Sequence, residues 1–271
     1  MKSKQLLKNL LAKQLSKSGG KLGVGVYLLL NLFVAIAMLV SIVQGDGKHV
    51  VACLKICTMF LIPWLIEWKF KIEISSIFIL LIQIFMYAAI ILGELNSYYM
   101  KYPYWDTVLH AINGFLCASV GFMLVNRIVE QTKSYKLSMK PIYTVVFAFC
   151  LSMTVGVMWE FYEFGMDNFC NRDMQKDTII HTIKSAKLSQ GDQSLTILKD
   201  VTDVSINGES LNLGGYLDIG LYDTMGDLFY NLVGTLVFCV LGYYVTKKEN
   251  EHKLVKCFIY VRVNGGQSDY A

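Results

Sequence analysis

The chain has 271 residues, of which 54% are hydrophobic and only 17% are charged, with a net charge of +4 and a mean hydropathy of +0.45. A soluble domain carries about 25% charged residues. The composition therefore argues against a soluble enzyme, a disordered chain and a nucleic-acid-binding module. It predicts a multi-pass protein whose first partner is the lipid bilayer.

Residues 1–23 form a basic segment ahead of the first apolar run. They contain six lysines and no acidic residue, and leucines recur between the lysines from Leu6 to Leu15. This pattern fits an amphipathic helix on an anionic membrane face, and it also fits a plain positive flank of the first span. One segment can do both, so we expect 1–23 to be a basic amphipathic cytoplasmic segment. The apolar run that follows is longer than the core of a signal peptide, which indicates an uncleaved anchor.

Six apolar runs approach the length of about 20 residues that crosses a bilayer. They lie near residues 24–43, 50–66, 74–93, 107–125, 142–164 and 226–245. The second run is the weakest, because Lys55 and Pro63 interrupt it. We predict an all-α polytopic membrane helix bundle of about six transmembrane helices, with the membrane domain at 24–245 and a cytoplasmic tail at 246–271.

The segment 166–225 is the one sizeable part of this domain outside the predicted spans. Asp177 to Leu188 is predicted to be helical, and Ser194–Leu213 is predicted to form a hairpin around the turn dipeptide Asn207-Gly208. We therefore expect a small α/β extracytoplasmic loop between the fifth and sixth helices. A further short strand is expected at 258–263.

Basic residues indicate the orientation of the chain. With the N-terminus inside, the cytoplasmic segments hold 17 lysines and arginines and the outer segments hold seven. Cytoplasmic loops are enriched in Lys and Arg. This asymmetry predicts that both termini are cytoplasmic and that the loop 166–225 faces outward.

Three of the predicted spans carry acidic or imidazole residues at helical spacing. Asp106 and His110 share one face of the fourth span, i and i+4 apart. The fifth and sixth spans have similar stripes, and their members are Glu160, Glu163 and Asp167 on the fifth and Asp223, Asp227 and Asn231 on the sixth. The predicted topology puts all three stripes at the outer ends of their helices, and Lys55 on the second span is expected at a similar depth.

Charged side chains that face lipid are costly, so these groups should face one another or a water-filled pocket. Gathered carboxylates also need protons, a lysine or a metal ion to balance them. We predict a site in which His110, Glu160, Asp227 and Asp106 bind a divalent ion such as Zn, Mn or Fe. Glu163 or Asp223 would then act as general base or acid.

Structural explanations exist for each of these residues. Asp106 and Asp223 lie near predicted helix N-termini, where a carboxylate caps free N–H groups. Asp167 can simply be solvated. Hydrogen bonds between helices could account for His110, Glu160 and Asp227.

The three motifs resemble a known pattern, with D-x-x-x-H at Asp106 and His110, a pair of glutamates at Glu160 and Glu163, and D-x-x-x-N-x-x-G from Asp227 to Gly234. The region from about 75 to 245 is similar to the VanZ-like membrane proteins, and more similar to the YjdF-like family of uncharacterised bacterial inner-membrane proteins. The resemblance implies a bacterial plasma-membrane protein with a site at the outer leaflet. It implies no particular reaction.

Three functions remain open from the sequence. The first is a metal-dependent enzyme acting on a lipid or a lipid-linked cell-envelope substrate. The second is a non-catalytic membrane module that binds an envelope or protein partner. A proton-coupled transporter ranks below both, because the inner halves of the spans are almost free of charge and no inverted repeat is visible.

Overall fold

The computed structural model describes residues 21–70, 72–131, 140–189, 194–248 and 262–263. The predicted amphipathic segment 1–23 therefore lies almost entirely outside the described residues, and so does most of the tail 246–271. The chain forms two compact units. One comprises residues 1–153 and 231–271, and the other comprises residues 154–230.

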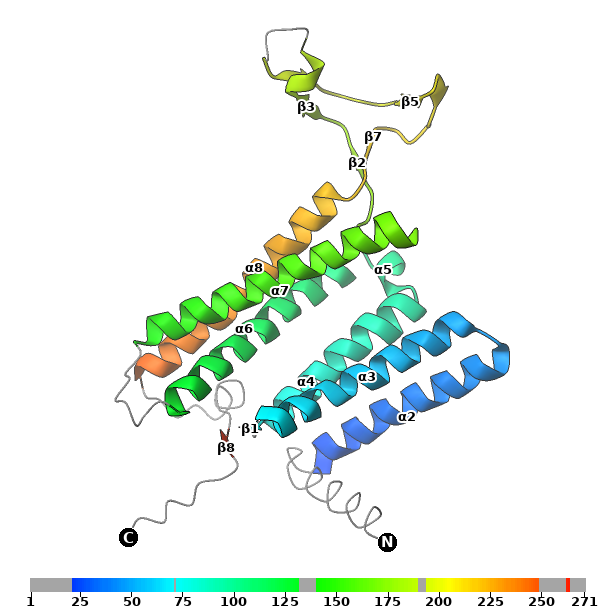
Figure 1. Cartoon of the computed structure of the whole chain (residues 1–271). Helices are drawn as coiled ribbons and strands as arrows, with labels where there is room; N and C mark the ends of the chain where they lie inside the picture. The colour runs from blue at the N-terminus through cyan, green and yellow to red at the C-terminus, as the bar shows by residue number, and fades with distance from the viewer. Residues whose placement is uncertain (1–20, 71, 132–139, 190–193, 249–261, 264–271) are drawn as a thin grey trace, which may run out of the picture. The chain divides into compact units, whose positions relative to one another are not determined.

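The first unit is helical (Figure 1). Its helices are α2 (Lys21–Gln44), α3 (Gly47–Phe70), α4 (Ser76–Tyr87), the π-helical turns of η1 (Ala88–Leu95), α5 (Tyr98–Lys101) and α6 (Trp105–Gln131). Two longer helices, α7 (Pro141–Cys170) and α8 (Leu221–Lys248), contribute to both units. The short strands β1 (Ile72–Glu73) and β8 (Arg262–Val263) pair antiparallel. Of the strand expected at 258–263, only residues 262–263 are described, and these two form β8.

Local sequence explains where two of these helices begin. Pro141 is the first residue of α7, a position where its missing N–H forfeits no helical hydrogen bond. At the start of α3, the Asp46 carboxylate accepts hydrogen bonds from the backbone N–H groups of Lys48 and His49, at 3.1 and 3.2 Å. These bonds satisfy two of the donors that a helix start leaves free. The His49 N–H is the main cause of a lowered pKa for Asp46.

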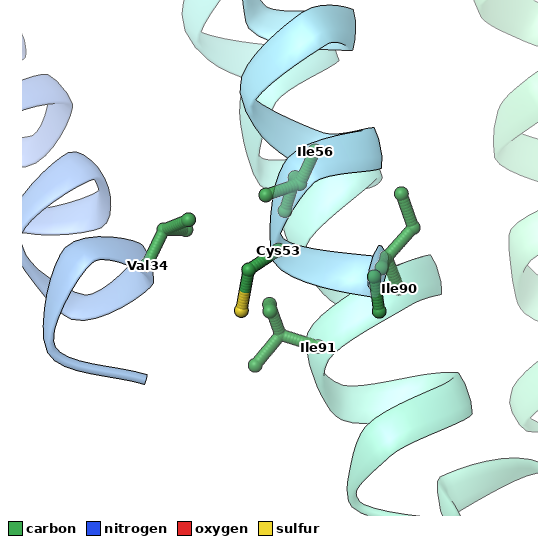
Figure 2. Packing of buried hydrophobic residues seen from close by; sticks show 6 residues of the cluster. Val34, Cys53, Ile56, Ile90 and Ile91 are labelled. Atoms are coloured by element: carbon green, nitrogen blue, oxygen red, sulfur yellow. The ribbon is translucent and has the colours of Figure 1, made fainter. Parts of the chain in front are cut away.

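A compact apolar core joins α2, α3 and η1 (Figure 2). Val34 of α2 faces Cys53 and Ile56 of α3, and Ile90 and Ile91 of η1 complete the cluster. All five side chains are at most 5% exposed. Apolar packing thus joins α2, α3 and η1.

Four helical stretches of the described chain are long and apolar enough to cross a membrane. They are Ile77–Leu95, Trp105–Asn126, Pro141–Cys170 and Leu221–Tyr244, which correspond to the third to sixth predicted spans. The first predicted span corresponds to a shorter apolar stretch, Leu28–Gln44. The second corresponds to α3, which contains Lys55 and Pro63. The count of six spans therefore stays a prediction.

The second unit carries a loop built from two-stranded ribbons. Its strands are β2 (Thr178–Ile180), β3 (Ile183–Ser185), β4 (Thr196–Leu198), β5 (Ser205–Ile206), β6 (Glu209–Ser210) and β7 (Tyr216–Asp218), with a 3-10 turn, η3, at Ala186–Leu188. β2 pairs with β7, β3 with β4, and β5 with β6, all antiparallel.

The prediction of a helix from Asp177 to Leu188 is wrong for most of that segment. The segment contains the strands β2 and β3, and only the last three residues turn helically. Thr178, Ile179, Ile180 and Ile183 are β-branched, and such side chains favour extended backbone.

The prediction of a hairpin in Ser194–Leu213 is correct at its turn and wrong in its outer strands. Asn207 and Gly208 have φ angles of 55° and 89° and join β5 to β6. These positive angles are those of the tight turn that such a dipeptide favours. The strand β4 at Thr196–Leu198, however, pairs with β3, which precedes it in the chain and lies outside the predicted hairpin.

Glycines allow a very close approach of α6 and α8 in the first unit. A Cβ atom added at Gly114 would collide with the backbone oxygen of Asn231, and one added at Gly234 would collide with the backbone oxygen of Ala111. At Gly121, an added Cβ would lie 2.9 Å from the Cα of Ala148 on α7. Small residues let helix backbones touch where lipid supplies no hydrophobic drive for association.

Substitution of Gly234 by Ala should therefore destabilise the first unit. The collision is with backbone rather than with a flexible side chain, so the helices must separate, at a cost of about 1–3 kcal/mol as for other overpacked cores. Gly226→Ala on the same helix is the matched control, because nothing lies within 4 Å of its added Cβ. Thermal unfolding in detergent should show a lower midpoint for Gly234→Ala and an unchanged or higher one for Gly226→Ala. Equal midpoints would contradict the close approach.

Candidate functional site

A buried polar network lies at the contact of α6, α7 and α8 in the first unit. The Ser152 hydroxyl is 2.7 Å from that of Thr235 and donates to the backbone oxygen of Gly114 at 2.9 Å. The amide of Asn113 donates to Asn231 Oδ1 at 3.2 Å. Ser152, Asn231 and Thr235 are fully buried. Asn231, predicted as a site residue, thus links the three helices.

Sequence reasoning did not single out Ser152, Thr235 or Asn113 as candidates. Small hydroxyl residues are common in membrane helices, where they bond to backbone oxygens, and nothing in their spacing marks these three. The only sequence signal was the location of Asn113 one residue before the close-packed Gly114. The contacts of Asn113, Ser152 and Thr235 give the network a structural role.

Three of the predicted site residues come together in the second unit. Glu160 and Glu163 lie on α7 and Asp227 lies on α8, and one carboxylate oxygen from each lies within 4.8 Å of the others. We call these three residues the carboxylate cluster. All three are at most 6% exposed. Like charges this close repel strongly away from water, so the cluster requires protons or a cation to balance it.

Trp159 holds one member of the carboxylate cluster in place. Its indole Nε1–H donates to Glu163 Oε1 at 2.9 Å, one helical turn along α7. A bond of this kind to a carboxylate is stronger than a neutral one and fixes the rotamer of the acceptor. Trp159 was not predicted as a site residue; its position four residues before Glu163 was the available signal.

Asp106 and His110 form a pair on α6 in the first unit. His110 Nε2 lies 3.4 Å from Asp106 Oδ1, and the two side chains are 9% and 17% exposed. Asp106 lies in the first turn of the helix, as predicted. The carboxylate cluster belongs to the other unit, so the predicted meeting of His110 with Glu160 and Asp227 stays a prediction.

Asp167 and Asp223 fix the base of the loop. Both oxygens of Asp167 accept backbone N–H groups, from Met174 at 2.6 Å and Gln175 at 2.8 Å. Asp223 Oδ2 accepts the next backbone N–H, that of Lys176, at 2.9 Å. Three consecutive amides are thus held by carboxylates from α7 and α8. These contacts give both aspartates a structural role at the loop base.

A further aspartate, Asp218, caps the start of α8. Asp218 Oδ2 accepts the backbone N–H of Tyr222 in the first turn of α8, at 2.9 Å. Asp223 itself lies within that first turn. The chain enters this helix at Gly220, whose φ is 104°.

Lys55 forms an ion pair within the first unit. Its Nζ lies 3.6 Å from Glu94 Oε2 of η1. Glu94 was not among the predicted site residues, although it is the one acidic residue of the apolar stretch Ile77–Leu95. The ion pair lies in the first unit, between α3 and η1.

The family of the chain follows from a comparison with family models. The model for the family described as "Predicted membrane protein (DUF2238)" matches residues 26–248. The chain belongs to this family. No curated protein and no solved structure matches it. Membership, together with the four apolar helical stretches, establishes a membrane protein.

The family match covers the described helices of this DUF2238 member from α3 to α8, and all of α2 except its first five residues. It therefore spans the polar network, the carboxylate cluster and the loop together. The match assigns the membrane class without an activity, so the function has to be argued from the geometry of these groups.

The loop of the DUF2238 member also shows a titration effect. Desolvation raises the pKa of Asp177, and the nearby charges of Asp173, Asp218 and Asp167 raise it further. Because the folded pKa lies above its ordinary value of 3.8, the ionised carboxylate destabilises the folded loop at neutral pH. The loop gains stability as the pH falls through the folded pKa.

Asp177→Asn should therefore stabilise the loop base at pH 7. The amide removes the repulsion, so protection of the backbone N–H groups of residues 174–180 against hydrogen exchange should rise. The advantage should shrink as the pH falls through the raised pKa of Asp177 in the folded loop, because the wild-type carboxyl then becomes neutral as well. Asp200→Asn, on the same loop, serves as the control and should leave this protection unchanged. Lower protection in Asp177→Asn at pH 7 would contradict the raised pKa.

Proposed function

We propose that this DUF2238 member is a cation-dependent membrane enzyme that acts on a lipid or a lipid-linked cell-envelope substrate. The observation that carries the proposal is the carboxylate cluster of Glu160, Glu163 and Asp227, buried within one unit on two membrane helices. Intramembrane ionisable groups are functional candidates because their burial is otherwise costly.

The donor atoms suit a hard divalent cation. Carboxylate oxygens are the ligands preferred by Mg²⁺, Ca²⁺ and Mn²⁺, whereas Zn²⁺ and Fe²⁺ favour sites that include imidazole. Two ligand atoms on opposite sides of an ion are about 4.2 Å apart when each bond is about 2.1 Å. Separations of up to 4.8 Å between the cluster oxygens need only small side-chain rotations to reach that value. Mn²⁺ is therefore the best probe among the ions that the sequence suggests.

A cation held by these carboxylates would supply Lewis-acid chemistry, chiefly by lowering the pKa of a bound water. The chain's own contribution is to hold three oxygens on two rigid helices and to fix Glu163 through Trp159. Of the two predicted acid–base residues, Asp223 has its Oδ2 oxygen engaged by the Lys176 N–H. The proposal therefore assigns no catalytic role to Asp223.

The orientation of the site in the membrane and its further ligands are proposed from the sequence alone. The charge asymmetry of the loops supports cytoplasmic termini, with the carboxylate cluster near the outer face of a bacterial plasma membrane. The polar stripes support His110 and Asp106 as additional ligands at the same level. The resemblance to YjdF-like and VanZ-like proteins rests on the same stripes.

A second function is favoured by the loop. Its ribbons expose the apolar side chains of Ile197 and Ile206, at 46% and 56%, and Ile219, directly after β7, is 80% exposed. Two-stranded ribbons bury little apolar area by themselves. A module that binds an envelope partner through this loop would lose function on substitution of these residues and keep it on substitution of the carboxylate cluster.

Metal content gives the direct test. Wild-type protein purified in detergent and dialysed against Mn²⁺ should retain about one ion per chain by elemental mass spectrometry. Glu160→Gln and Asp227→Asn should each lower the affinity at least tenfold, because each removes a charged ligand, and His110→Ala tests the extension to α6. Glu209→Gln in the exposed β6 is the control and should bind as wild type. Wild-type protein without bound ion at saturating Mn²⁺ would overturn the proposal.

Trp159→Phe should weaken Mn²⁺ binding by about tenfold, as loss of a bond that orients a ligand commonly does. Phenylalanine keeps the ring and removes only the N–H that holds Glu163. Trp105→Phe is the matched control, because Trp105 Nε1 has no hydrogen-bond partner among the described residues. Equilibrium dialysis measures both variants. Equal affinity in the two would show that the indole N–H does not position the carboxylate.

A further inference from the structure

The ion pair between Lys55 and Glu94 lies on an open surface of the first unit. The two side chains are 46% and 45% exposed, so the described chain covers about half of each. Glu94 belongs to the helical stretch Ile77–Leu95, which is long and apolar enough to span a membrane. A charged pair on such a helix surface is costly when lipid covers it and inexpensive when polar protein groups do.

The surface of α3 around Lys55 is a continuous stripe. Its exposed residues recur at helical spacing, and they are Val51, Leu54, Lys55, Thr58 and Leu61. We call these five residues the α3 stripe. All but Lys55 and Thr58 are apolar, and Thr58 donates its hydroxyl to the backbone oxygen of Lys55 at 2.7 Å. The α3 stripe thus presents one charge in an otherwise lipid-compatible surface.

The opposite face of α3 is already occupied. Cys53 and Ile56 are completely buried, and they pack against Val34 of α2 and Ile90 and Ile91 of η1 (Figure 2). The inner face of α3 therefore has its neighbours within the unit. The α3 stripe, with Glu94 beside it, is open to a further contact.

Charge decides what fits this surface. A positive group and a negative group side by side are self-complementary about a two-fold axis, because Lys55 of one copy can face Glu94 of another and the reverse. We propose that the α3 stripe and Glu94 form a two-fold interface between two copies of this chain in the membrane. Each copy supplies the same patch, and the two intrachain pairs join into a network of four charges.

The test exchanges the two charges. The double variant Lys55→Glu/Glu94→Lys keeps the ion pair within the chain, so its fold is retained. Two copies of the variant can still pair with each other about the two-fold axis. A variant copy facing a wild-type copy, however, places lysine against lysine and glutamate against glutamate. The exchange therefore changes the choice of partner and leaves the intrachain contact in place.

Copies with two different affinity tags are co-expressed, solubilised in mild detergent and captured through one tag. Wild type with wild type, and variant with variant, should be captured together. Wild type with variant should be captured at least tenfold less. Lys48→Glu, at the exposed start of α3, is the control and should be captured with wild type as efficiently as wild type is. Equal capture of the mixed pair, or a monomeric wild type by light scattering, would overturn the proposal.

Discussion

The contact of α6 with α8 at Gly114 and Gly234 is the constraint on which the polar network of the first unit depends. Each glycine lies against a backbone oxygen of the other helix, so the two backbones meet without intervening side chains. Close approach brings short polar side chains within hydrogen-bond reach, which is why Ser152 and Thr235 can bond to each other and to Gly114. Longer side chains at the glycines would remove both the contact and the network.

Acidic residues in this chain are accommodated in three physically different ways. At helix and loop ends, backbone N–H groups hold the carboxylates, as at Asp46, Asp167 and Asp223. On the surface of the first unit, Glu94 has a lysine partner. In the carboxylate cluster, three buried carboxylates lie close to one another. Gathering like charges away from water is costly, and this cost is why the cluster carries the functional proposal.

The sequence predicted the long apolar helices, because these follow from local periodicity. Glu160 and Glu163 are one turn apart on a helix whatever its neighbours are, and their meeting with Asp227 follows from the need to shield charge from lipid. The partner of Lys55 could not be predicted in this way, since it depends on which helix lies beside α3. The loop was predicted least well: strand β4 pairs with β3 across an intervening turn, and no short-range pattern specifies that register.

The pairing of β2 with β7 has a consequence for how the chain can vary in length. Ile180 lies opposite Tyr216, so the two ends of the segment between them are held side by side by this strand pair. The entropic cost of closing a loop grows only with the logarithm of its length. Insertions or deletions between Ile180 and Tyr216 therefore impose little strain on the helices. This segment is suited to accepting a whole folded domain without rearrangement of α7 or α8.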